Sequence, residues 1–269
     1  MKGIFNGKLI DFSQLTFGET ERAFNYGDGL FETIIVRKGK IGLLDYHLER
    51  LHTGMSVLSI NGNDITKEAV EKNIEALVAS RNYTENTRIK MLVWRKSGGL
   101  YTPQNNTANV LITATDLHPR SKIIDKAEIA KTINLSYSSI SGLKTCNALP
   151  YILAGLEKKA KHLDEIIILD NKGNLAECSS SNLFWIKDDV IYTPALSSGC
   201  IAGVMRRNII EQARLTGRKL IETLEKPAVL ASAGQVFCCN VTGIYVFQNI
   251  GTQNYKVELD PKVLSWENS

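Results

Sequence analysis

Residues 177–185 read ECSSSNLFW, and residues 142–147 upstream of them read GLKTCN. The first stretch places the carboxylate of Glu177 among small polar residues, just before an apolar run typical of a buried strand. The second places Lys144 in a short loop of small residues before an expected helix. A carboxylate that pairs with a pyridinium nitrogen and an amine that forms a Schiff base are the two protein groups that pyridoxal phosphate (PLP) chemistry requires. The presence of both stretches in one chain favours an enzyme.

Each of these two residues has an ordinary alternative interpretation. Most lysines are surface charges, and Glu177 would also suit a turn that follows Gly173. The setting of Lys144 favours chemistry, because its neighbours are small or apolar and no acid stands near it in the sequence. A lysine in an apolar site has a lowered pKa and becomes a competent nucleophile and base. The polar residues 179–182 can hold the backbone around Glu177 through hydrogen bonds.

A phosphate group needs hydrogen-bond donors, and three segments offer them. Arg50 lies on an expected helix. Residues 199–206, GCIAGVMR, lead into another helix, where free amides and the helix dipole favour an anion. Residues 240–243, NVTG, follow a strand and add the hydroxyl of Thr242. Each signal is weak alone, but together they supply the donors that PLP needs.

Composition limits the class of protein. The 269 residues are 43% hydrophobic and 22% charged, which is typical of a globular protein with one large or two modest domains. The net charge of +4 is not gathered into a polybasic run, so we expect no nucleic-acid partner. No apolar run approaches the ~18 residues of a membrane span, and the N-terminal residues do not resemble a signal peptide. Five cysteines, an odd number, indicate a reducing compartment, and we expect the cytoplasm.

The apolar periodicity alternates between strands and helices and predicts an α/β (α+β) chain. We expect strands over residues 30–37, 88–95, 108–115, 129–135, 165–169, 182–186 and 235–240, and helices that start at N-caps Asp45 and Thr66 and over residues 150–161 and 203–215. The periodicity is lost over residues 117–125, which we interpret as a linker between an N-terminal domain, residues 1–116, and a C-terminal domain, residues 126–269.

Read jointly, these segments resemble the class IV aminotransferases, the fold-type IV PLP enzymes. The resemblance covers nearly the whole chain. It is carried by Lys144 and by YGDGLFET at residues 26–33, HLERL at 47–51, ECSSSNLF at 177–184, YTP at 192–194 and GVMR at 203–206.

The resemblance implies a role for each candidate residue. Lys144 would form the Schiff base and remove the substrate α-proton, and Glu177 would pair with the pyridine nitrogen. The phosphate would be held by Arg50, by the backbone amides of Val204 and Met205, and by Thr242. The family pattern also implies a smaller N-terminal and a larger C-terminal domain with the cofactor between them. It further implies a homodimer whose partner subunit helps to close the pocket for an amino-acid-like substrate.

The family includes 4-amino-4-deoxychorismate lyase, D-amino-acid aminotransferase and branched-chain aminotransferase. Branched-chain enzymes usually have a longer loop after the lysine, with a tyrosine at the position where this chain has Ala148. The loop WRKSGGLY, residues 94–101, and the compact length resemble the lyases. We therefore expect a lyase that releases pyruvate and forms 4-aminobenzoate. The alternatives are an aminotransferase of branched-chain or D-amino acids with 2-oxoglutarate, and an inactive PLP-binding protein.

Two further residues are expected to bind the substrate. Arg95 would contact a substrate carboxylate, since its loop should border the pocket, and Tyr26 is a comparable candidate. A surface arginine at a strand end is the alternative for Arg95. We expect no metal, because His47 and His52 fall on different faces of a helix and no Cys/His cluster has zinc spacing.

Overall fold

The structure, a computed structural model, describes residues 2–80, 86–118, 120–258 and 260–266. It divides into two compact units. The first contains Met1–Pro119 and Leu143–Asn147, and the second contains Arg120–Gly142 and Ala148–Ser269. The main division falls within residues 117–125, where we expected the linker. The segment around Lys144 differs from the expected domain bounds, because it belongs to the first unit.

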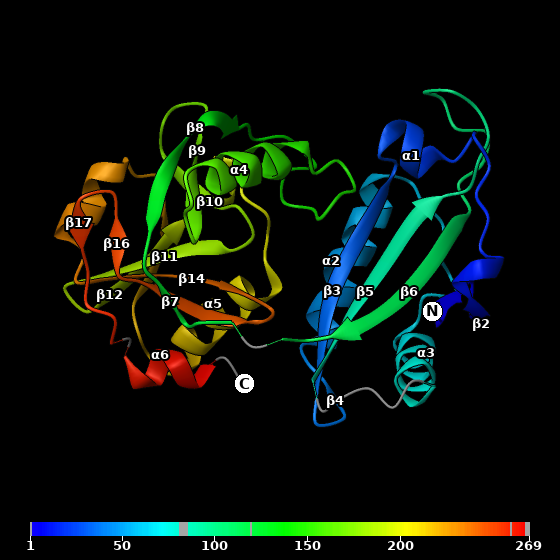
Figure 1. The fold of residues 1–269 in the computed structure, drawn as a ribbon, viewed down its shortest axis with the longest axis horizontal. Helices are drawn as coiled ribbons and strands as arrows, with labels where there is room; N and C mark the ends of the chain where they lie inside the picture. Colours follow the sequence, from blue (N-terminus) through cyan, green and yellow to red (C-terminus); the bar gives the residue numbers. More distant parts are fainter. Residues whose placement is uncertain (1, 81–85, 119, 259, 267–269) are drawn as a thin grey trace. The chain divides into compact units, whose positions relative to one another are not determined.

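The first unit is built on one antiparallel six-stranded sheet with the order β2-β1-β6-β5-β3-β4 (Figure 1). Helix α2 packs on β3, and α3 packs on β1 and β6. Its elements are β1 (Lys2–Phe5), β2 (Lys8–Asp11), the 3-10 helix η1 (Phe12–Gln14), α1 (Arg22–Tyr26), β3 (Gly29–Arg37), β4 (Lys40–Ile41), α2 (Leu44–Val57), α3 (Lys67–Ala79), β5 (Asn86–Arg95) and β6 (Ala108–Asp116).

The helix starts of this unit test two of the expected caps. The prediction for Thr66 is confirmed, since its hydroxyl accepts a hydrogen bond of 3.2 Å from the amide of Ala69. The prediction for Asp45 is wrong, because Leu43 is the N-cap of α2 and Asp45 lies in the first helical turn. There the Asp45 carboxylate lies 2.7 Å from the ammonium group of Lys67. An acid in the first turn still favours the helix through its dipole.

The second unit contains two sheets, a five-stranded one with the order β10-β9-β8-β16-β17 and a six-stranded one with the order β13-β12-β11-β14-β15-β7 (Figure 1). Helix α4 packs on β8 and β9, and α5 packs on β13 and β14. Its elements are β7 (Ile123–Ile124), β8 (Ala127–Leu135), α4 (Leu149–Ala160), β9 (Glu165–Asp170), β10 (Leu175–Cys178), β11 (Asn182–Lys187), β12 (Val190–Pro194), η2 (Leu196–Ser198), α5 (Val204–Leu215), β13 (Leu220–Thr223), η3 (Pro227–Ser232), β14 (Gln235–Asn240), β15 (Gly243–Phe247), β16 (Asn249–Ile250), β17 (Gln253–Asn254) and α6 (Pro261–Ser265).

The core of the second unit draws on both of its sheets. Ile167 and Leu175 of the five-stranded sheet and Leu183, Trp185 and Phe247 of the six-stranded sheet belong to one buried cluster. Their burial is the main favourable term for this unit, since apolar area removed from water stabilises the fold by about 25 cal/mol per Å². Because this cluster pins β10 against its neighbours, the end of β10 is a rigid place for a functional side chain.

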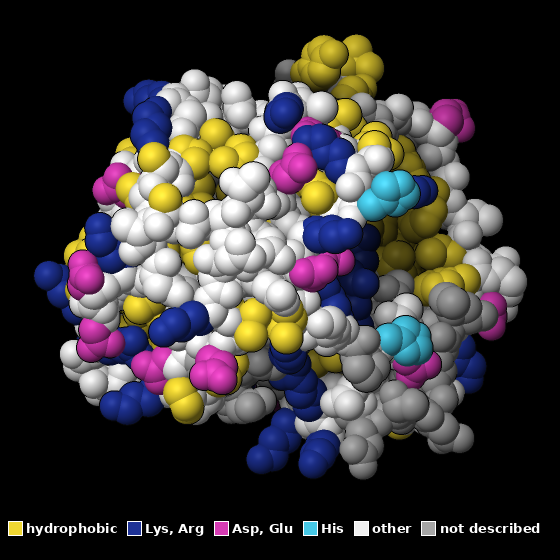
Figure 2. Space-filling model, turned by 60° about the vertical axis from the view of Figure 1, so that its left-hand side comes forward, with side chains coloured by type: hydrophobic (Ala, Val, Ile, Leu, Met, Phe, Trp, Pro, Cys, Tyr) yellow, Lys and Arg dark blue, Asp and Glu magenta, His cyan; other side chains and the backbone are white. Residues whose placement is uncertain are grey.

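The mixture of an antiparallel sheet with helices and two further sheets, one with parallel β8 and β9, confirms the expected α/β (α+β) class. In the described ranges no helix is both long enough and apolar enough to cross a membrane. Basic and acidic side chains both occur across the face shown in Figure 2, with apolar side chains between them.

Candidate active site

Lys144 is held by the backbone of the first unit. Its carbonyl accepts a 2.9 Å hydrogen bond from the amide of Phe31, and Cys146 donates one of 2.9 Å to the carbonyl of Gly29. Thr145 forms an isolated antiparallel bridge with Leu30, so residues 144–146 run along β3 like a short extra strand. The Lys144 ammonium nitrogen lies 4.6 Å from the centre of the Phe31 ring. The backbone pairing therefore fixes where this amine is presented.

Arg50 belongs to a buried cluster that also contains Glu32 and His47. Glu32 lies on β3, and the other two lie on α2, three residues apart and therefore on one helix face. The Nε of Arg50 donates to Oε1 of Glu32 at 2.8 Å, and its Nη2 pairs with Oε2. Nδ1 of His47 lies 2.6 Å from the same Oε2. One carboxylate thus binds both an arginine and a histidine.

Burial and pairing act in opposite directions on the pKa values of this cluster. Burial alone would raise the pKa of Glu32, but the hydrogen bond from His47 and the charge of Arg50 outweigh it and lower that pKa. Burial lowers the pKa of His47 and outweighs the contact with Glu32. The cluster therefore contains an ionised carboxylate, a guanidinium and a neutral imidazole.

Glu177 lies on β10 in the second unit, so it is a strand residue and not a turn carboxylate. It is buried and accepts hydrogen bonds from three described groups. The Tyr151 hydroxyl donates to Oε1 at 2.6 Å, the amide of Ile201 donates to Oε1 at 3.1 Å, and the Asn182 side chain donates to Oε2 at 3.2 Å. Burial, and then the charge of Glu177, raise the pKa of Tyr151, so this phenol stays protonated and donates. Three donors hold the carboxylate in one orientation.

The segment before α5 is coupled to Glu177 through Asn182. The amide of this side chain also donates to the carbonyl of Ile201 at 2.8 Å. A side chain at Gly203 would place its Cβ 1.9 Å from the Asn182 Oδ1. Only glycine leaves Asn182 room for both bonds.

The candidate phosphate donors of the second unit come from two segments. Val204 and Met205 form the first turn of α5, whose N-cap Gly203 makes no side-chain hydrogen bond to the helix. Because glycine has no side chain to cap the helix, the first backbone amides of α5 are suited to an anion. Thr242 lies in the turn from β14 to β15, where Asn240 accepts from its amide at 2.8 Å and from its hydroxyl at 2.6 Å. Asn240 in turn donates to the hydroxyl of Ser181 at 3.0 Å, which links this turn to the segment after Glu177.

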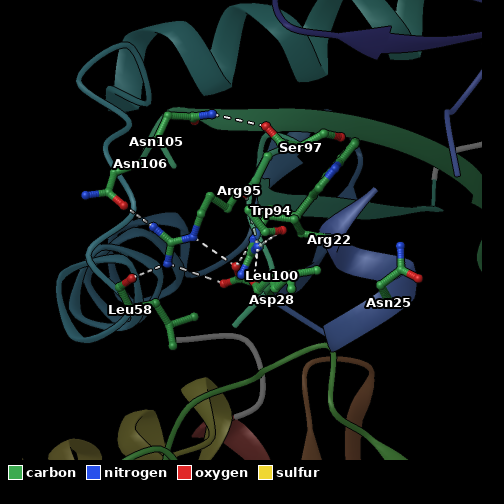
Figure 3. A network of polar contacts seen from close by, with 12 residues as sticks. Arg22, Asn25, Asp28, Leu58, Trp94, Arg95, Ser97, Leu100, Asn105 and Asn106 are labelled. Carbon is green, nitrogen blue, oxygen red and sulfur yellow. Dashed lines mark hydrogen bonds and ion pairs between the residues drawn. The ribbon is translucent and has the colours of Figure 1, made fainter. Parts of the chain in front are cut away.

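Arg95 does not have the role that we expected for it. Its guanidinium is buried, and Nε donates to Asp28 at 2.9 Å (Figure 3). Nη1 donates to the Ser59 carbonyl at 3.0 Å. It also donates to the side chain of Asn106, to the carbonyl of Leu58 and, at 3.4 Å, to the second oxygen of Asp28. All five N–H groups of the guanidinium are engaged inside the first unit. The prediction of a substrate contact is therefore corrected, because no donor remains for a carboxylate.

Asp28 bridges two arginines in the same network (Figure 3). Nε of Arg22 donates to it at 2.7 Å, and Nη1 of Arg22 donates to the carbonyls of Gly98, Gly99 and Leu100. Burial would raise the pKa of Asp28, but the two arginines lower it. The network ties the loop after β5 to α1.

Tyr26, at the end of α1, remains partly exposed. The guanidinium of Arg22 lies 4.9 Å from the centre of its ring, and the ring of Tyr101 lies 5.6 Å away. The two histidines that we set aside as metal ligands have separate partners, since Nε2 of His52 lies 2.9 Å from the Ile65 carbonyl while His47 pairs with Glu32.

Sequence reasoning missed Glu32, His47 and Tyr151. The signal for Glu32 was present, because it shares the period-2 face of Leu30 and Ile34, which are buried. An acid on a core face must be paired, so a basic partner could have been sought on the next helix. The partnership of Tyr151 with Glu177 joins residues far apart in the chain and has no local signal.

Comparison with known proteins shows a match to a protein-family model and to named relatives. A family model described as amino-transferase class IV matches residues 29–248. A probable branched-chain-amino-acid aminotransferase of Rickettsia bellii is 28% identical over 253 residues, which cover 92% of this chain and 85% of the relative. The aminodeoxychorismate lyase of Bacillus subtilis is also 28% identical, over 257 residues that cover 93% of this chain and 87% of the relative.

A solved structure agrees in fold. The crystal structure of 4-amino-4-deoxychorismate lyase from Pseudomonas aeruginosa matches with a TM-score of 0.85 and 26% identity, covering 98% of this chain and 96% of that one. Proteins named for two different reactions are therefore similar to this chain at comparable identity.

Proposed function

The chain belongs to the class IV aminotransferase family of PLP-dependent enzymes, and from this premise we propose that Lys144 forms the Schiff base with PLP and that Glu177 pairs with its pyridine nitrogen. The anchoring of Glu177 is the observation that carries the proposal. Three donors, from Tyr151, Asn182 and the Ile201 amide, hold this buried carboxylate. A pyridine nitrogen needs such a fixed, ionised partner to stay protonated.

Each unit also offers groups with the chemistry that the phosphate of the cofactor needs. The amides of Val204 and Met205, at a helix start without a side-chain cap, suit a phosphate. Arg50 supplies a guanidinium, and Thr242 supplies a hydroxyl that would turn from Asn240 toward the phosphate. When bound, PLP supplies an electron sink that stabilises negative charge on the carbon next to the substrate amine.

Lys144 would perform the proton transfers. As a free amine, Lys144 would act as the general base for the substrate α-proton, a role that requires it to be neutral. Its backbone pairing with β3 supports this role, because hydrogen bonds hold the segment that carries the amine in place.

We propose aminodeoxychorismate as the substrate, with pyruvate and 4-aminobenzoate as the products. The support is Ala148, directly before α4, where branched-chain enzymes usually carry a tyrosine. The similarity to the B. subtilis and P. aeruginosa lyases agrees with this choice. An aminotransferase acting with 2-oxoglutarate is the second candidate, and the similarity to the R. bellii protein favours it. Tyr26 is the proposed substrate residue that remains, since the donors of Arg95 are occupied.

We also propose a cytoplasmic homodimer. Helix α4 exposes Leu149, Ile152, Leu153 and Leu156, which recur at helical spacing on one side. In a two-fold homodimer the same surface of each subunit meets its copy, and an apolar row of this kind could be buried in that way. The five cysteines are unpaired, which suits a reducing compartment.

The test is product analysis with the purified protein. Incubation with aminodeoxychorismate should yield pyruvate and 4-aminobenzoate, and incubation with amino acids plus 2-oxoglutarate should yield no glutamate. Glutamate without pyruvate would replace the lyase by an aminotransferase. A yellow protein that forms neither product would be an inactive PLP binder.

A further inference from the structure

The cluster of Glu32, His47 and Arg50 has an order of exposure. The side chain of His47 is 1% exposed and that of Glu32 is 2% exposed, whereas that of Arg50 is 11% exposed. The carboxylate and the imidazole therefore lie behind the guanidinium. A charged side chain is rarely buried so completely unless it is paired, so the burial of Glu32 depends on its two neighbours.

The contact between Glu32 and Arg50 fixes a plane as well as a distance. Nε of Arg50 meets Oε1 at 2.8 Å, while Nη2 meets Oε2. Two parallel bonds of this kind hold a guanidinium in the plane of the carboxylate, which a single bond does not do. The Nε and Nη2 atoms of Arg50 are thus both engaged by Glu32, which fixes the direction in which the whole guanidinium points.

His47 completes this arrangement from behind. Its Nδ1 lies 2.6 Å from an ionised carboxylate oxygen, so Nδ1 carries the proton of the neutral ring. Nε2 is then an acceptor, and it is buried with no hydrogen-bond partner among the described residues. Burial of Nε2 without a partner is unfavourable, so the hydrogen bond of the imidazole to Oε2 of Glu32 is its main polar contact among the described residues.

We propose that Glu32 and His47 are positioning residues that hold the Arg50 guanidinium in the orientation in which it binds the phosphate group of the cofactor. The inference rests on the proposed function, because Arg50 is a phosphate ligand only if the protein binds PLP. A role of Glu32 through charge alone predicts the opposite change in phosphate affinity when Glu32 is removed. If Glu32 merely neutralised Arg50, its removal would strengthen the attraction for a phosphate, whereas the loss of a positioning group weakens it.

The experiment compares PLP with pyridoxal, which has no phosphate group. The full-length protein is freed of cofactor, and the dissociation constants of both compounds are measured by absorbance titration for the wild type and for Glu32→Gln. We expect the dissociation constant of PLP to rise about tenfold, as the loss of a hydrogen bond to a charged group implies. That of pyridoxal should change by less than about twofold. Glu157→Gln, which alters a buried carboxylate of the second unit, should change neither.

A pair of His47 variants gives an independent measurement if Glu32→Gln does not fold. His47→Asn keeps an N–H group near the position of Nδ1, and His47→Leu removes it. His47→Leu should weaken PLP but not pyridoxal, and His47→Asn should restore PLP binding to within about twofold of the wild type. In an Arg50→Ala background, Glu32→Gln should cause no further loss, because the residue it positions is gone.

Three results would overturn the inference. They are unchanged or tighter PLP binding in Glu32→Gln, equal losses for PLP and pyridoxal, and a full Glu32→Gln effect in the absence of Arg50. Failure of the proposed function looks different, since the wild-type protein would then form no Schiff-base absorbance band with PLP or with pyridoxal.

Discussion

The Tyr151 hydroxyl donates a 2.6 Å hydrogen bond to Oε1 of Glu177, so the first turn of α4 holds the carboxylate at the end of β10. The bond spans two elements that are separated by β9 in the chain. It joins a phenol that stays protonated to a buried acid, and a hydrogen bond to a charged group stabilises by about 1.5–3 kcal/mol.

Removal of this hydroxyl should impair catalysis more than folding. We expect Tyr151→Phe to lower kcat by about tenfold, because Glu177 keeps the bonds from Asn182 and Ile201 but loses the shorter bond from Tyr151. Steady-state kinetics and the absorbance of the bound cofactor are the measurements. Tyr192→Phe is the control, since its ring stacks on Trp185 in the same unit. An equal loss of kcat in both variants would argue against a special role for Tyr151.

Lys144→Ala should abolish the Schiff-base absorbance band and lower activity by at least about 10³-fold, within the range of a lost general base. Lys90→Ala is a matched control, because its ammonium nitrogen lies 5.3 Å from the same Phe31 ring that Lys144 contacts at 4.6 Å. Lys90→Ala should keep the band. A band that survives in Lys144→Ala would show that another lysine binds the cofactor.

Gly203→Ala should destabilise the protein by about 1–3 kcal/mol, the usual cost of overpacking. Its Cβ would clash with the Asn182 Oδ1, and a displaced Asn182 would lose its bonds to Glu177 and to the Ile201 carbonyl. Gly234→Ala serves for comparison, because its Cβ would meet no atom closer than 3.9 Å. Denaturant unfolding of both variants checks the difference, and equal stability would contradict the clash.

Glu157 should contribute a measurable part of the acid sensitivity of the fold. Burial would raise its pKa, but Lys161, Thr132 and the amides of β8 lower the pKa to about 2. A lowered pKa in the folded state gives stability that is present above the unfolded pKa and is lost as the pH falls through the folded one. Glu157→Gln should therefore cost about 2 kcal/mol at pH 7. That difference from the wild type should shrink between pH 4.5 and pH 2, and a constant difference in urea unfolding would exclude this assignment.

Leu153→Glu should convert the proposed homodimer into monomers. The change puts a charge into the exposed apolar row of α4, where a partner subunit would have to bury it. Light scattering coupled to size-exclusion chromatography gives the mass. Leu264→Glu, on the exposed side of α6, should leave the mass unchanged. If the wild type is already a monomer, the dimer is excluded.

Several features followed from local sequence. The strand at β11, the helices α3 and α5 and the cap at Thr66 were predictable, because a short window contains the periodicity or the capping residue that creates them. The same reasoning wrongly predicted Asp45 as the N-cap of α2. The N-cap is Leu43, whose backbone lies in the left-handed region, and capping preferences do not predict a leucine in that conformation.

Local sequence likewise identified some residues of the candidate site and not others. Lys144 and Glu177 were identifiable as an amine and a carboxylate in suitable settings, and their roles in catalysis stay predictions. Arg95 was not predictable, because a strand-end arginine looks the same whether it faces solvent or is surrounded by Asp28 and the carbonyls of Leu58 and Ser59. No local pattern distinguishes these surroundings.

The sequence by itself determined the residue types on which PLP chemistry depends and the elements that carry them, because propensity, periodicity and capping act over a few neighbouring residues. Only the tertiary structure decided which groups meet. It joins the Lys144 segment to β3, Glu177 to Tyr151, and Arg50 to Glu32. These contacts form between distant parts of the chain, where packing and the need to pair buried polar groups select the partners.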